Sequence, residues 1–165
     1  GDFQLISENT TLTTDAISTM QGASIRLNDV NGIRFYTQID EDALAVLVGD
    51  KEYEIGTLIA PKDSSGDYLT VEDDHVKVAY DMTNDLWAGN KIVGSLVNIK
   101  DTNIARDFVA RAYVLVDGVY YYSESQSVRS LAYVANEFVK DTDNFAKLDT
   151  VTKELVEAWA SKFNG

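Results

Sequence analysis

One short stretch constrains the fold of this chain more than any other. Residues 110–124 read as two strands joined at Asp117-Gly118. This dipeptide accepts the positive φ angles that a tight hairpin demands. A two-residue loop also fixes the register and places Tyr113 directly opposite Tyr122. The sequence therefore predicts an antiparallel hairpin at this point.

The two faces of this hairpin differ in character. One is mainly aliphatic, and the other carries an aromatic trio, Tyr113, Tyr120 and Tyr122. The aromatic face either lies beneath another layer or forms a platform that stacks on sugars and partner surfaces. The pattern leaves both alternatives open. The same register sets Arg111 opposite Glu124, where we expect a cross-strand ion pair.

A second hairpin is predicted earlier in the chain, where residues 23–27 and 33–39 alternate between apolar and polar side chains. We expect a three-residue loop, Val30 to Gly32, with Gly32 in the left-handed region, so that Leu27 pairs with Phe35. One face of this hairpin is then polar and suited to hydrogen bonding. Its candidate binding residues are Arg26, Arg34, Tyr36 and Gln38.

The remaining patterns indicate more strands and two terminal helices. Strands are expected near 53–60, 75–80 and 91–99, with a short helix at 42–48. Helical spacing begins behind Ser127 and again behind Asp149 or Thr150. We predict an α+β fold, an antiparallel sheet or β-sandwich of at least six strands with two C-terminal helices packed on it.

We expect one extracellular module over residues 1–165. Its parts are an N-terminal extension or edge strand at 1–20, mainly antiparallel strands at 21–125 and the two helices at 127–164. The chain opens without a basic and apolar signal segment. We expect any signal and anchor to lie elsewhere in a larger protein, in which this module is monomeric.

Composition narrows the classes of partner. Lys and Arg number 14 against 27 Asp and Glu, a net charge of −13. So acidic a surface repels phosphate backbones and anionic lipid, which argues against binding to nucleic acid or to a membrane surface. No run of 18 apolar residues is present, so membrane insertion is not expected. There is no cysteine, so disulfides and thiol chemistry are excluded.

Catalysis is not expected. The single histidine, His75, lies among acids, and no serine has the surroundings of a nucleophile elbow. No pair of carboxylates stands out for glycoside hydrolysis. Calcium is a possible cofactor, because Asp141 begins an acidic run like a calcium loop. The run has Ala146 where that loop needs glycine, and we interpret it as a connection with Asp149 as a helix cap.

Aromatic side chains are the best functional lead. Sugar recognition uses flat apolar rings flanked by hydrogen-bonding groups. Trp87 lies in a polar, turn-like stretch where an indole is unexpected unless it packs or binds. We list Trp87 as a ligand-binding candidate beside the tyrosine trio and the polar hairpin face.

Several segments, in this order and spacing, resemble a module of large secreted or cell-wall-attached proteins of anaerobic gut Firmicutes. The resemblance covers about residues 20–140. It implies a cell-surface location and a modular context, and it brings no known catalytic or ligand residues. The segments are Gly22–Leu27, Gly32–Phe35, Ile55–Pro61, Gly94–Ile99, Ala110–Tyr113, Tyr120–Ser123 and Ser127–Ser130.

The resulting expectation is a non-catalytic binding module for polysaccharide or host glycan. The alternatives are an adhesin for a host protein such as mucin or immunoglobulin, and a spacer domain without a ligand. Tyr and Arg are common at protein interfaces, so the adhesin would use the same residues.

Overall fold

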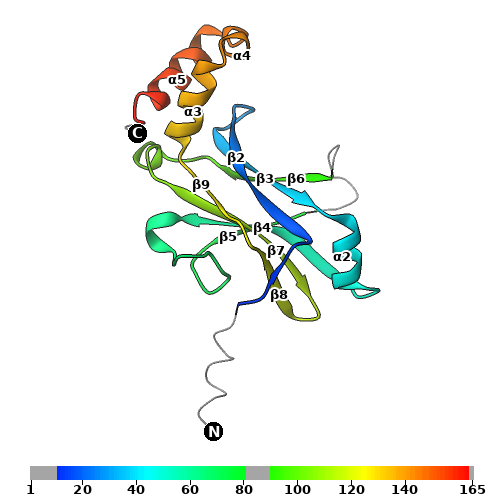
Figure 1. The fold of residues 1–165 in the computed structure, drawn as a ribbon. Coiled ribbons are helices and arrows are strands. Elements are labelled where there is room, and N and C mark those ends of the chain that lie inside the picture. The colour runs from blue at the N-terminus through cyan, green and yellow to red at the C-terminus, as the bar shows by residue number, and fades with distance from the viewer. Residues whose placement is uncertain (1–10, 81–89, 164–165) are drawn as a thin grey trace.

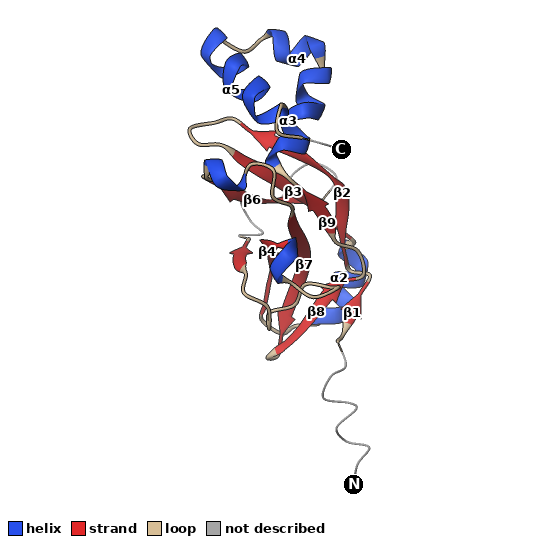
Figure 2. Ribbon diagram, turned by 90° about the vertical axis from the view of Figure 1, so that its left-hand side faces the viewer, coloured by secondary structure: helices blue, strands red, loops and turns tan. Residues whose placement is uncertain are grey.

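The computed structural model describes residues 11–80 and 90–163. It confirms the predicted α+β class, with nine strands in two sheets of six and three strands. Figures 1 and 2 show the sheets in the body of the molecule and three helices gathered at one end.

The larger sheet has the strand order β1-β8-β7-β4-β5, and β9 also pairs with β7. All its pairs are antiparallel except β1 with β8. β7 is its most buried strand. The strands are β1 (Thr13–Thr14), β4 (Tyr53–Pro61), β5 (Val76–Ala79), β7 (Phe108–Val116), β8 (Val119–Ser123) and β9 (Ser127–Arg129).

The smaller sheet is antiparallel throughout, with the order β2-β3-β6. β2 begins before the expected hairpin, and its register shifts between Thr19 and Ala23. The strands are β2 (Ile17–Arg26), β3 (Gly32–Ile39) and β6 (Lys91–Val97).

The Asp117-Gly118 hairpin forms as predicted. Tyr113 pairs with Tyr122 and Val116 with Val119. Both turn residues have positive φ, 55° at Asp117 and 76° at Gly118. These angles match the right-handed twist of the two strands, which is why this dipeptide selects the register.

The register predicted for the earlier hairpin is wrong by four residues, since Phe35 pairs with Ala23 and not with Leu27. Gly32 is a strand residue opposite Arg26. The positive φ, 67°, belongs to Asp29. Asn31 holds the longer loop, because its side chain bonds both the N–H and the carbonyl of Ile99. A shift of four residues preserves side-chain parity, so the predicted faces are retained.

The helices lie at the side and at one end of the sheets (Figure 1). The first terminal helix, α3, is capped by Ser130 and not by Ser127, because residues 127–129 pair with β7. Asp149 caps α5 as expected, accepting from the Thr152 N–H at 2.7 Å. The helices are α2 (Glu41–Val48), α3 (Leu131–Lys140), α4 (Thr142–Ala146) and α5 (Thr150–Ala160), with 3-10 turns η1 (Lys62–Ser64) and η2 (Asp101–Asn103).

The apolar stripe expected on the last helix is only partly covered. Val156 is fully buried, and Trp159 packs against the same core cluster. Val151 and Leu155 are exposed, because α5 packs mainly on α3 and not over a sheet face. Figure 2 shows this stack of helices beyond the ends of the strands.

The core fills the space between the two sheets. Ile25 and Phe35 of the smaller sheet meet Ile59 and Ala110 of the larger one. A second cluster joins the two sheets beside α2. A third lies on the opposite, outer side of β7. The central strand is therefore buried on both faces.

A row of buried hydroxyls joins the two sheets. Between Ser123 and Ser127 the chain leaves the edge of β7, and the Ala112 N–H donates to Thr19 Oγ1 of β2 at 2.9 Å. Thr19 Oγ1 also lies 2.8 Å from Ser123 Oγ. Ser127 Oγ donates to the Gln21 carbonyl at 2.9 Å. These contacts, here called the hydroxyl seam, set β2 across β7.

Replacing Thr19 by valine should therefore destabilise the fold with little change in shape. The substitution leaves the buried Ala112 N–H without an acceptor, which costs about 1–3 kcal/mol. Urea unfolding of both proteins measures the loss. Thr37→Val is the matched control, since Thr37 is also buried but makes no side-chain hydrogen bond within the described residues. Equal stability losses in the two variants would contradict the role of the seam.

Gly94 is the point where β6 approaches β4 most closely. A Cβ there would lie 2.9 Å from Thr57 Cβ and 2.8 Å from Tyr80 Oη. Gly94→Ala should cost about 1–3 kcal/mol by forcing the sheets apart. Gly22→Ala is the control, because a Cβ at Gly22 meets nothing within 4 Å. Thermal or urea unfolding that ranks the two variants equally would refute this packing argument.

Candidate functional site

The outer face of the three-stranded sheet is the most open polar surface among the predicted sites. Pairing places Arg34 between Ser24 and Ser95, and Tyr36 beside Val93. Within the described residues the helices pack with core clusters on the inner side and leave this face uncovered. We call it the outer sheet face; its half-buried residues are Ser24, Arg26, Arg34, Tyr36, Gln38, Lys91, Val93 and Ser95.

Hydrogen bonds hold the side chains of this face in place. Tyr36 Oη lies 2.7 Å from Ser24 Oγ. Arg26 Nη1 donates to the Val30 carbonyl at 2.7 Å, and Arg34 Nη1 donates to the Ile25 carbonyl at 3.0 Å. Groups held before a ligand arrives lose less conformational entropy on binding. The structure thus brings together Arg26, Arg34, Tyr36 and Gln38, as the alternation predicted.

The tyrosine trio has a different place. Tyr113 is 0% and Tyr122 4% exposed, and Tyr120 is half-buried against both rings. The loop after η1 covers them, with the Val71 N–H donating to Tyr122 Oη at 3.1 Å. Buried rings cannot stack on a sugar. The alternative of a covered layer therefore describes this face, and it is not a binding platform.

The ion pair expected between Arg111 and Glu124 is not among the ion pairs of the described residues. Arg111 is buried and donates to the carbonyls of Ser123 and Leu69. The strand pairing ends at Tyr113 and Tyr122, so Glu124 leaves the ladder before it reaches Arg111.

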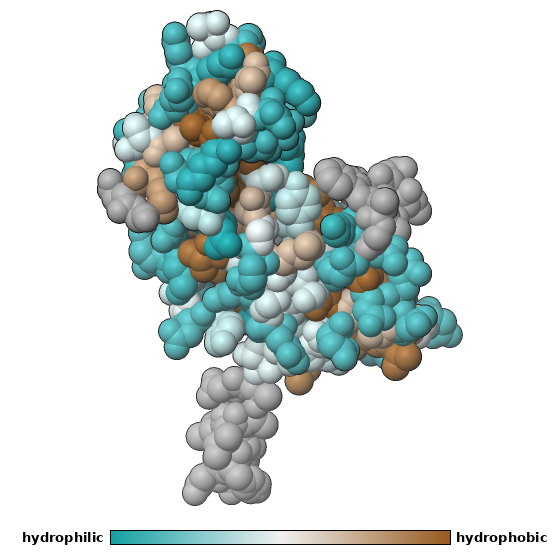
Figure 3. Space-filling model, turned by 45° about the horizontal axis from the view of Figure 1, so that its top comes forward, coloured by the Kyte–Doolittle hydropathy of each residue, from teal (hydrophilic) through white to brown (hydrophobic). Residues whose placement is uncertain are grey.

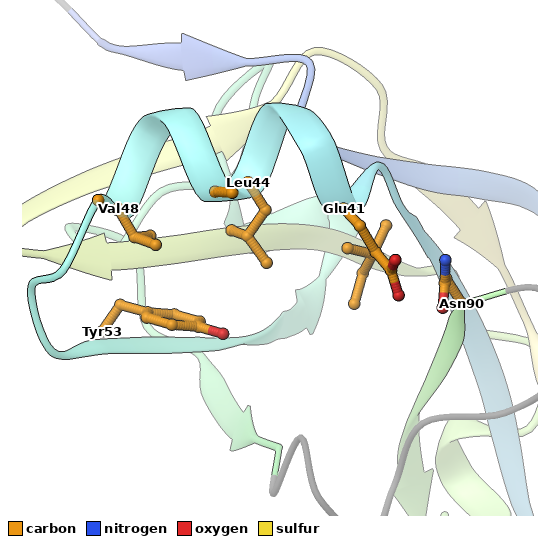
Figure 4. A pocket seen from close by; sticks show the side chains of 8 residues that line it. Glu41, Leu44, Val48, Tyr53 and Asn90 are labelled. Carbon is orange, nitrogen blue, oxygen red and sulfur yellow. The ribbon is translucent and has the colours of Figure 1, made fainter.

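Trp87 lies outside the described residues, and its binding role stays a prediction. A pocket of about 370 Å³ lies beneath α2. Figure 4 shows Leu44 and Val48 facing the ring of Tyr53, with Glu41 and Asn90 toward the other end. Its largely aliphatic lining suits a small apolar group more than a sugar, which needs several hydrogen-bonding partners.

Over residues 11–80 and 90–163, no three His, Cys, Asp or Glu side chains cluster as metal ligands. Asp141 caps α4 through the Asn144 N–H. No helix in the same part of the chain is long and apolar enough to cross a bilayer. In the view of Figure 3, apolar residues form small groups among hydrophilic ones.

No protein-family model matches this chain, and no curated protein matches it either.

A buried phenol and a carboxylate make the clearest electrostatic contact of the larger sheet. Tyr113 Oη donates to Glu54 Oε2 at 2.6 Å, and Lys77 Nζ lies 3.0 Å from the same oxygen. The hydrogen bond from Tyr113, followed by that from Lys77, lowers the pKa of Glu54 below its usual value. Burial raises the pKa of Tyr113 well above its usual value. The contact is structural and faces away from the outer sheet face.

Tyr113→Phe should lower the free energy of unfolding by about 1–2 kcal/mol near neutral pH, because the hydrogen bond to a charged acceptor is lost. The folded-state pKa of Glu54 lies below its unfolded value. The stabilisation is therefore present above the unfolded pKa and lost as pH falls through the folded one. Urea unfolding from neutral to acidic pH should show the two proteins converging.

Tyr121→Phe is the control for this pH series, since the Tyr121 hydroxyl makes no hydrogen bond within the described residues. It should follow the wild type at every pH. A stability difference between wild type and Tyr113→Phe that does not change with pH would contradict the link to Glu54.

Proposed function

We propose that this chain is a non-catalytic, cell-surface binding module that recognises polysaccharide or host glycan on the outer sheet face. The observation that carries the proposal is a sheet face, left uncovered by the other described residues, on which one phenol, two guanidinium groups and one amide lie together. Tyr36 supplies an aromatic ring, and Arg26, Arg34 and Gln38 supply polar groups for sugar hydroxyls.

Two properties of the outer sheet face favour glycan binding: its surface is flat, and its side chains are held in place by hydrogen bonds. Antiparallel strands set side chains of neighbouring strands about 5 Å apart, so the polar groups form a continuous low relief. The hydrogen bonds to Ser24, Val30 and Ile25 hold three of them in one conformation. An extended glycan can lie along such a face. One sugar unit then stacks on the ring of Tyr36, and the hydroxyls form hydrogen bonds with the polar side chains around it.

The adhesin reading uses the same residues. Tyr and Arg dominate the energetics of protein interfaces, and Val97 at the end of this sheet is exposed. A protein ligand would bury a larger area than a glycan and tolerate the loss of sugar groups. A comparison of glycosylated and deglycosylated ligands therefore separates the two functions.

The test is an array of polysaccharides and host glycans, with and without calcium, followed by titration of any ligand found. Tyr36→Ala should weaken binding about tenfold, the loss expected when a stacked ring is removed. Tyr36→Phe keeps the ring and should retain most of the affinity. Trp87→Ala is measured in parallel, because the role of that residue is a separate prediction.

Tyr53→Ala is the matched control, an exposed tyrosine on the other sheet, 39% accessible. It should bind as the wild type does, and unfolding curves confirm that each variant is folded. Binding that persists in a folded Tyr36→Ala variant would remove the outer sheet face as the site. Binding to deglycosylated mucin or immunoglobulin that needs Tyr36 would favour the adhesin.

A further inference from the structure

A second concave site lies on the opposite side of the molecule from the outer sheet face. A cavity of about 290 Å³ opens beside β8 and the loop after η1, and Arg111 lines it. Arg111 stands on the outer side of β7 with Tyr113 and Val109. The rest of the lining is polar or aromatic: Thr11, Thr13, Tyr68, Thr70 and Glu124.

Arg111 is a buried cation with no acidic partner among residues 11–80 and 90–163. It is 3% exposed, and none of the ion pairs in the described residues includes it. Its Nε donates to the Ser123 carbonyl at 2.8 Å and its Nη1 to the Leu69 carbonyl at 3.1 Å. Buried charges are ordinarily paired, because removal from water is costly. Two carbonyls orient this guanidinium but do not neutralise it.

Two tyrosine rings complete the setting. The guanidinium carbon lies 4.9 Å from the ring centre of Tyr122 and 5.2 Å from that of Tyr68. Such contacts stabilise a cation and fix its orientation. The Nη2 group of Arg111 makes no hydrogen bond within the described residues. Burial lowers the pKa of Arg111, the direction expected when desolvation is not offset by an acid.

From this geometry we infer that the Arg111 cavity binds the carboxylate of an acidic sugar. A carboxylate can neutralise the guanidinium and take its remaining N–H groups. The ring of Tyr68, 58% exposed, offers a stacking face at the cavity mouth. Threonine hydroxyls and the Glu124 carboxylate can bond the hydroxyls of the same sugar.

The surface beside the Arg111 cavity has room for further sugar units of the same chain. A shallower hollow of about 590 Å³ shares Tyr68 and Glu124 with the Arg111 cavity. Gln21 and Gln126 line it and add amide groups, which bond sugar hydroxyls. An acidic unit at Arg111 can thus continue into a neighbouring polar groove.

The net charge of −13 does not forbid an anionic ligand here. At physiological ionic strength, exposed charges are largely screened beyond about 8 Å, whereas a buried cation is screened much less. Within the lining of the cavity, the charged groups are Arg111 and Glu124. This site does not depend on the proposal for the outer sheet face, which belongs to the other sheet.

The test is calorimetric titration of the whole chain with galacturonate, galactose and acetate. Galacturonate and galactose differ mainly in the carboxylate, and acetate carries the charge without the ring. Galacturonate should bind at least about tenfold more tightly than either. Equal affinity for galactose, equal affinity for acetate, or no binding of galacturonate would each overturn the inference.

Single substitutions test whether galacturonate binds in the Arg111 cavity. Arg111→Lys keeps a positive charge but loses the planar fork, and it should weaken galacturonate about tenfold or more. Tyr68→Ala, at a ring that is 58% exposed, should weaken galacturonate binding severalfold. If Arg111→Lys does not fold, the Tyr68→Ala variant still tests whether galacturonate binds in this cavity. Lys140→Ala, at an exposed lysine of α3 that pairs with Glu137, should bind galacturonate as the wild type does. Unchanged affinity in folded Tyr68→Ala and Arg111→Lys would refute the site.

Discussion

The hydrogen bond from the Ala112 N–H to Thr19 Oγ1 is the contact on which the arrangement of the two sheets depends. β7 pairs with β8 on one stretch and with β9 on another, and on that edge the chain between them leaves Ala112 without a strand partner, although Ala112 pairs with Thr57 of β4 on the other edge. An unsatisfied buried N–H is costly. The hydroxyl of Thr19, on the other sheet, accepts the hydrogen bond from this N–H. β2 must therefore cross β7 at this point. The core clusters form on either side of that crossing.

This crossing also decides which surfaces are available for binding. β2 covers the inner side of β7, and the loop after η1 covers its outer side. The aromatic trio therefore packs beneath that loop. Among the described residues, the same packing leaves the polar face of β2 and β3 without a covering layer. It also buries Arg111 at the edge of the covered region, beside a cavity. Both candidate sites thus lie on sheet faces that point away from the core between the two sheets.

Patterns with a local cause were predictable. The Asp117-Gly118 turn specified its register, and strict alternation placed Arg34, Tyr36 and Gln38 on one face. Errors arose where a distant group overrode the local signal. Asn31 bonds to Ile99, which lengthens the first hairpin loop. Residues 127–129 pair with β7, which moves the helix start to Ser130. An arginine on an otherwise apolar strand face was the one available signal for the Arg111 cavity.

The sequence by itself determined the α+β class, the parity of each strand and the position of the tight turn, because these follow from residues a few positions apart. It also set the excess of acids and the absence of thiols. Only the tertiary structure decided which face of each sheet is covered. That choice rests on contacts between residues such as Thr19 and Ala112, more than ninety positions apart. Alternation marks two faces of a strand, but burial is a property of what packs against them.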